Sequence, residues 1–166
     1  DKTLSTNTLK YTNKFIDYRF ICHNFRRDIG TDEIYIPWYG SNEDTSMDAV
    51  SSAFLAPYKM ILHKLLVRPD GLTDTSGDGS ETNATDLRFA LDKQDDGDVT
   101  VDSIATFTYD TLLHNESFIT INRSDWSADP SVEAGDKIGL SIDSSADPSG
   151  VINWYITSVW ETEIII

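Results

Sequence analysis

The sequence has 166 residues, of which 39% are hydrophobic and 25% charged, a composition typical of one folded domain and not of a disordered chain. Its formal net charge is −15 at pH 7. A field of this sign repels phosphate backbones and anionic lipid surfaces, which argues against nucleic acid and membrane partners. No apolar run reaches the ~20 residues that span a bilayer. Cys22 is the single cysteine, so no disulfide can form within the chain.

The amino-terminal third predicts an extended arm followed by strands. Residues 1–14 are rich in Ser, Thr and Asn, which is typical of an arm or tether. In residues 15–25, apolar and polar side chains alternate, and this period of two predicts a half-buried strand. A second strand is expected over 33–38, where Pro37 suits an edge or a strand end. Residues 39–52 are dominated by loop-forming residues and predict a surface connection.

Residues 58–67 fit two templates. Their apolar positions match a helical stripe almost as well as one face of a strand. Pro57 and Pro69 bound a segment that is short for an isolated helix, and the other periodic segments of the chain have a period of two. We therefore interpret this segment as a strand.

The second half of the chain predicts further strands separated by turn residues. Asp96-Gly97 favours a tight hairpin, so residues 99–109 should pair back on residues 87–91. The remaining candidates are residues 118–121, 138–142 and 152–165. About eight short strands without an amphipathic helix predict an all-β fold, an antiparallel two-sheet sandwich that is jelly-roll-like. The sandwich should be a single domain over residues 15–166, with the arm preceding it.

The expected core is the set of large apolar residues that share one face of these strands. It comprises Leu87, Phe89, Ile138, Leu140, Ile142, Trp154, Ile156 and Trp160. The chain ends in three aliphatic residues, Ile164, Ile165 and Ile166, where polar residues are usual, so we expect a partner to cover them. Trp126 lies among polar residues, and it either fills a neighbour's pocket or folds back onto its own sheet.

Most residue patterns that support catalysis are missing from the sequence, and paired carboxylates have little diagnostic value because 28 acidic residues produce close pairs by chance. There is no Gly-x-Ser-x-Gly elbow, and the three histidines, His23, His63 and His114, have no metal-ligand spacing. Isolated histidines on strands more often have a structural role. We therefore expect no catalytic residues and no enzyme activity.

One acidic loop partly matches a calcium site. Asp74, Ser76 and Asp78 stand at the alternate positions of a calcium-binding loop, but its twelfth position is Thr85 where a bidentate Glu is needed. A solvated acidic loop is the favoured interpretation, and bound calcium is the weaker alternative. No other cofactor is expected.

Several segments resemble a known group of proteins. They include Tyr35-Ile36-Pro37-Trp38, the segment Leu65-Leu66-Val67-Arg68-Pro69, residues 132–142 and residues 154–161. Together they are similar to modules that recur in virion structural proteins of tailed, mostly marine, bacteriophages, and the likeness extends over residues 20–166. It implies a β-rich virion component repeated many times on a capsid or tail, with trimeric association.

The leading functional hypothesis is a non-enzymatic virion structural protein on the particle surface. It would act as a capsid decoration (cement) subunit or as a terminal tail-fibre domain, through self-association as a homo-oligomer, expected to be a trimer, and through contact with capsid or tail proteins. The alternative is a carbohydrate- or receptor-binding adhesion module that recognises a host surface glycan through its loops. A hydrolytic enzyme on a sandwich scaffold is the third and weakest hypothesis.

Overall fold

The computed structural model describes residues 14–27, 29, 31–41, 43–47, 51–70, 87–95, 100–110, 118–144 and 152–165. The strands are β1 (Lys14–Arg27), β2 (Ile34–Tyr35), β3 (Phe54–Leu55), β4 (Met60–Asp70), β5 (Leu87–Gln94), β6 (Asp102–Tyr109), β7 (Ile119–Asn122), β8 (Ser131–Val132), β9 (Lys137–Ser144) and β10 (Ile152–Ile165). A 3-10 helix, η1 (Arg123–Asp125), follows β7. None of the described residues forms a helix long and apolar enough to cross a membrane.

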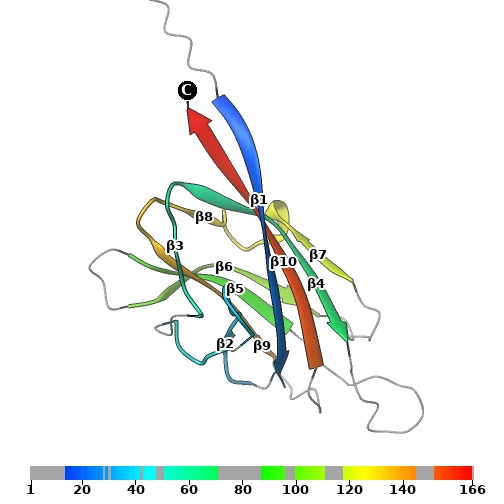
Figure 1. Ribbon diagram of the computed structural model, residues 1–166. Coiled ribbons are helices and arrows are strands. Elements are labelled where there is room, and N and C mark those ends of the chain that lie inside the picture. The colour runs from blue at the N-terminus through cyan, green and yellow to red at the C-terminus, as the bar shows by residue number, and fades with distance from the viewer. Residues whose placement is uncertain are drawn as a thin grey trace, which may run out of the picture.

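The strands form two antiparallel sheets that face each other (Figure 1). The first sheet has the order β1-β10-β4-β7, with β8 also on β4; the second has the order β2-β9-β5-β6, with β3 on β9. When the two-residue strands β3 and β8 are set aside, consecutive strands alternate between the sheets except for the β5–β6 pair within the second sheet, and the first strand pairs with the last. This is the double Greek-key arrangement of a jelly roll. The predicted antiparallel two-sheet sandwich is confirmed.

The ambiguous segment at residues 58–67 is a strand. Within β4, burial alternates, and Leu65 pairs with Ser158 of β10 on one side and with Ile121 of β7 on the other. Pairing on both edges settles the choice, because a helix would leave β10 and β7 without a common neighbour. β5 and β6 also pair antiparallel as predicted, whereas their Asp96-Gly97 turn lies outside the described residues.

One expectation needs correction. The strand predicted over residues 33–38 is only two residues long, and after it the chain leaves the sheet at Pro37, which cannot donate a backbone hydrogen bond. The described part of residues 39–52 contains no named strand, as the predicted loop requires, and it contacts the sheet where the Tyr35 amide donates to the Asp44 carbonyl oxygen at 2.7 Å.

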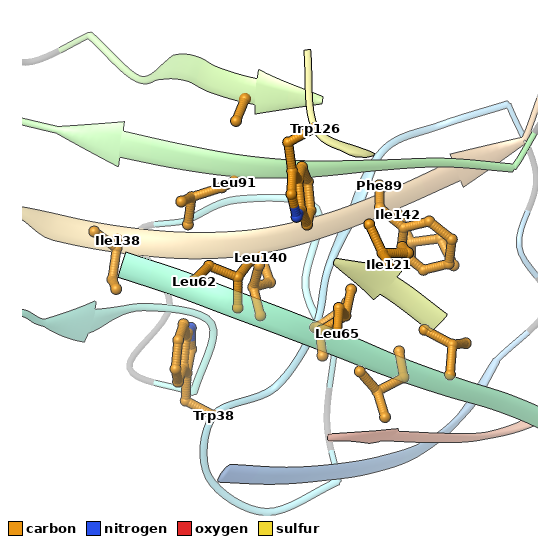
Figure 2. Close-up of a cluster of buried hydrophobic side chains, with 14 of the residues drawn as sticks. Trp38, Leu62, Leu65, Phe89, Leu91, Ile121, Trp126, Ile138, Leu140 and Ile142 are labelled. Atoms are coloured by element: carbon orange, nitrogen blue, oxygen red, sulfur yellow. The ribbon is translucent and has the colours of Figure 1, made fainter. Parts of the chain in front are cut away.

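The core lies between the two sheets. All eight residues assigned to it from sequence are at most 1% exposed. Figure 2 shows Phe89 and Ile142 of the second sheet beside Ile121 of the first. In β5, β9 and β10, the face that carries the predicted core residues is therefore the buried face.

Trp126 belongs to this core and not to an exposed interface. Its side chain is only 6% exposed, and it packs in the hydrophobic cluster between the sheets (Figure 2). The segment after η1 is fastened to β6, because the Ser127 amide donates to the Thr106 carbonyl oxygen at 2.8 Å and the Thr106 amide donates to Ser127 Oγ at 2.9 Å. This attachment places the indole between the sheets, so the alternative that Trp126 folds back onto its own sheet is confirmed and its assignment to a partner interface is wrong.

Two adjacent leucines in β4 test the register of the first sheet. Leu65 is fully buried, whereas Leu66 faces outwards and is half-buried. We expect Leu65→Ala to lower the free energy of unfolding by about 2–5 kcal/mol, because a cavity opens in the core. Leu66→Ala should cost less than about 1 kcal/mol. Urea unfolding measures both values, and equal losses would contradict the register.

Candidate functional site

The outer face of the second sheet is polar and is partly covered by its own chain. Arg88 bridges two acids, with Nη2 at 3.0 Å from Glu33 Oε1 and at 2.7 Å from Asp143 Oδ2. Nearby, Met47 is 1% exposed and lies over Gly139, where an added Cβ would come within 2.9 Å of the Met47 sulfur. The missing side chain at Gly139 thus allows the connection to pack on the sheet.

A buried carboxylate completes this polar face. Asp92 is 1% exposed and accepts hydrogen bonds from Ser103 Oγ at 2.5 Å and Ser141 Oγ at 2.6 Å. Burial raises the pKa of Asp92 above its usual value, while the two serine hydrogen bonds act in the opposite direction. These groups bind one another and leave no open cleft, so we assign them a structural role.

The outer face of the first sheet carries a group of exposed apolar side chains next to polar ones such as Lys64 and Arg68. Its exposed residues include Ile16 at 60%, Tyr18 at 42% and Phe20 at 69% of β1, and Tyr155 at 47% of β10. Their cross-strand partners place these side chains on the face opposite to the core, since Phe20 pairs with Val159 and the inward His23 pairs with Ile156. We call the set Ile16, Tyr18, Phe20, Leu66, Tyr155 and Val159 the apolar face.

A shallow groove of about 320 Å³ runs across the middle of the apolar face. Tyr18, Phe20, Leu66 and Val159 line it together with His63 and Lys64. A register shift between Val159 and Trp160 in the pairing of β10 with β4 lies beside this groove. The Tyr18 and His63 rings meet edge to face, with centroids 5.0 Å apart.

A larger polar hollow of about 620 Å³ adjoins the groove and shares His63 and Lys64 with it. Its walls include Asn122, Arg123 and Asp129, and the Arg123 Nε atom donates to Asp129 Oδ1 at 2.8 Å. The hydrogen bond to Asp129 raises the pKa of Arg123. In the described part of the chain, no three His, Cys, Asp or Glu side chains gather in a way that could hold a metal ion.

A serine and a histidine also meet in the structure, which the sequence did not indicate. Ser158 Oγ lies 2.9 Å from His23 Nε2, and His23 Nδ1 lies 2.9 Å from the Pro37 carbonyl oxygen. A carbonyl oxygen can only accept, so Nδ1 carries the proton and Ser158 donates to Nε2. Trp160 Nε1 in turn donates to Ser158 Oγ at 2.9 Å.

This serine and histidine are paired like a nucleophile and its base, but they are sealed from solvent. Ser158 is 0% exposed and His23 is 1% exposed. A hydrolytic site needs its nucleophile open to the substrate. The network instead connects β1 and β10 to residues 36–38, where Trp38 packs edge to face on the His23 ring at 5.1 Å. His23 therefore has a structural role.

The remaining predicted site residues occupy the ends of the sandwich or fall outside the description. Ile164 and Ile165 lie in β10, where they pair with Phe15 and Lys14. Ile166, the calcium-loop candidates Asp74, Ser76 and Asp78, and His114 lie outside the described residues. The apolar face was not among the predicted sites, although Ile16, Tyr18 and Phe20 at alternate positions were its visible signal.

No protein-family model matches the sequence, and no curated protein is similar to it. Among solved structures, the chain is similar to a chain of the acidic stable capsid structure of Helicobacter pylori bacteriophage KHP30, with 8% identity and a TM-score of 0.45 over 93% of this chain and 98% of that one.

The chain is also similar to Desmodium yellow mottle tymovirus, with 10% identity and a TM-score of 0.31 over 100% of this chain and 95% of that one. It is similar to the structure of Turnip yellow mosaic virus at 100 K as well, with 10% identity and a TM-score of 0.28 over 90% of this chain and 96% of that one. The jelly-roll assignment rests on the strand order of this chain itself.

The burial of His23 predicts how the stability of the fold depends on pH. Desolvation lowers the pKa of His23 below 6.5, so the unfolded chain binds more protons than the folded chain in this range. The contribution of His23 to stability is present above pH 6.5 and is lost as the pH falls through 6.5 towards the folded pKa.

Urea unfolding between pH 7.5 and pH 5 should show this loss in the native protein and a smaller loss in His23→Gln. His63→Gln is the matched control, because it removes a half-exposed histidine and keeps the buried His23, so the loss of stability assigned to His23 should remain. If His23→Gln lost as much free energy of unfolding between pH 7.5 and pH 5 as the native protein, the pH dependence would not come from His23.

Proposed function

We propose that this protein is a non-enzymatic structural component of a virion, holding its place by contacts of the apolar face with a neighbouring virion protein. The observation that carries the proposal is the contrast between the two outer faces. Polar groups and the chain itself cover much of the second sheet, whereas the first sheet exposes Ile16, Tyr18 and Phe20. Soluble monomers rarely expose apolar patches that are large and contiguous, and such patches mark interaction sites.

The fold supports this proposal in a general way. Jelly rolls occur in viral capsid proteins and in lectins, so the strand order is compatible with a shell subunit without deciding the function. The sequence resemblance to tailed-phage virion modules points in the same direction. The net charge of −15 is tolerable on a crowded particle, because physiological salt screens charges over about 8 Å.

The location on the particle is part of the proposal. A capsid decoration subunit or a terminal tail-fibre domain, at the virion surface and in several copies, would use the apolar face for its contact. Three-fold association and a role of Ile164–Ile166 in it stay predictions. Deletion of Ile164–Ile166 would remove the partners of Phe15 and Lys14 in β10, and we expect it to weaken association.

Particle occupancy tests the proposal. Particles assembled with Leu66→Asp should carry at most about a tenth of the native amount of this protein, because an unpaired carboxylate would be buried at the contact. Tyr39→Asp is the matched control, since Tyr39 is 61% exposed and lies outside the apolar face, and it should keep the native occupancy.

Cryo-electron microscopy of purified particles measures this occupancy and shows which face of the sandwich meets the neighbour. Urea unfolding of both variants checks that they fold. Native particles without density for the sandwich, or with the apolar face open to solvent, would contradict the proposal.

The polar hollow favours a second candidate function, binding of a host surface glycan. Its Asn122, Arg123 and Asp129 side chains offer donors and acceptors for sugar hydroxyls. Trp126 is buried and cannot serve as an exposed stacking platform. If this function holds, Arg123→Ala should weaken glycan-array binding by about tenfold, while Arg68→Ala, exposed on β4, should not. No binding by the native chain would remove this candidate.

A further inference from the structure

Three of the four sheet edges are short or are closed by the chain itself. β6 is capped at Thr106 by the two hydrogen bonds with Ser127. β2 has two residues, and its free side is bridged at Tyr35 by Asp44. β7 has four residues. Proteins commonly protect sheet edges in these ways, because an open edge offers unpaired amide and carbonyl groups to another chain.

The fourth edge, β1, is long and open. It has 14 residues and pairs with β10 on one side, and within the described ranges no strand pairs with its other side. It contains no proline or glycine, and Phe15, Ile16 and Phe20 are all more than half exposed. Such an edge is expected to accept a further strand. Figure 1 shows the start of β1 (blue) and the end of β10 (red) projecting together beyond the body of the sandwich.

The sequence of this edge is complementary to itself. If Tyr18 lies opposite Tyr18 of an antiparallel second copy, Asp17 faces Arg19 of that copy, and Arg19 faces its Asp17. On the other face of the strand, Phe20 then lies opposite Ile16. Opposite charges and apolar pairs at directly facing positions stabilise antiparallel strands. Within one chain, Arg19 Nη2 already lies 2.7 Å from Asp17 Oδ2, so both side chains share the face that the pairing requires.

Neighbouring registers lack this complementarity. A slip of two residues in one direction places Asp17 opposite Asp17, and a slip in the other direction places Arg19 opposite Arg19. Like charges at facing positions destabilise a strand pair. A slip of one residue would bring apolar residues of one copy against the opposite face of the other.

The pairing also fits the shape of the molecule. With Tyr18 on the two-fold axis, residues 14–22 of each β1 pair, and residues 23–27 of the two copies extend in opposite directions. The two sandwich bodies therefore lie on opposite sides of the axis. The outer faces of the two first sheets become continuous, and a two-fold contact of this kind is closed and does not propagate.

We propose that a second copy of this chain binds along β1, forming an antiparallel strand pair centred on Tyr18 that joins the two first sheets. This inference names one partner of the proposed virion subunit. It rests on β1, whereas the proposed function rests on the apolar face as a whole, so separate variants test the two.

A charge exchange tests the pairing. Asp17→Arg should raise the dimer dissociation constant by about tenfold or more, because four arginines would then meet at the axis. The double variant Asp17→Arg/Arg19→Asp restores opposite charges and should return the constant to within about threefold of the native value. Sedimentation equilibrium of the full chain measures all three constants.

Cysteine cross-linking tests the register. In a Cys22→Ser background, Tyr18→Cys places two thiols directly opposite each other, at a Cα separation of about 4.5–5.5 Å that a disulfide can span. Phe20→Cys is the matched control, because its two thiols would lie about 13 Å apart along the strands. Mild oxidation should yield a covalent dimer with Tyr18→Cys and little with Phe20→Cys.

The outcomes separate the two proposals. A native chain that stays monomeric at high concentration, a double variant as weak as Asp17→Arg, or equal cross-linking at positions 18 and 20 would overturn the β1 pairing. None of these results would change the particle occupancy of Leu66→Asp. Conversely, a confirmed β1 dimer that is absent from particles would overturn the virion role and leave the pairing in place.

Discussion

The fold depends on the burial of one face of β10 against the second sheet. β10 pairs with β1 along its whole length and with β4 over most of it, so it is the central element of the first sheet. Trp154 and Trp160, both 0% exposed, project from it into the space between the sheets. Burial of two indoles contributes several kcal/mol, and side chains of this size fix the distance and alignment of the opposing sheet.

The same alternation that fills the core decides what the protein presents to its surroundings. A strand whose inward residues are large and apolar has outward residues that are free to vary. In the second sheet, they form a polar network around Arg88 and Asp92, and in the first sheet they form the apolar face. The asymmetry gives the molecule one surface suited to solvent and one suited to a neighbour. We regard this asymmetry as the physical basis of the proposed structural role.

Polar groups inside the sandwich serve to position strands. The chain from Trp160 through Ser158 and His23 to the Pro37 carbonyl oxygen satisfies each buried polar atom with a partner. A buried network of this kind holds β1 against β10 and orients the segment that follows β2. On an accessible surface, the Ser158–His23 hydrogen bond would resemble a nucleophile and its base. Because both residues are buried, the bond instead makes this part of the fold rigid.

The sequence by itself determined the long strands and a large part of the core. Period-two alternation and turn residues are local signals, and they sufficed for the long strands and for the burial of Leu87, Phe89 and Trp154. Tertiary structure decided which face of β1 points inwards, since Ile16, Tyr18 and Phe20 form as regular a stripe as Ile21, His23 and Phe25. It also decided the position of Trp126 and the open edge of β1, because these depend on which distant strands become neighbours, and local alternation carries no information about that choice.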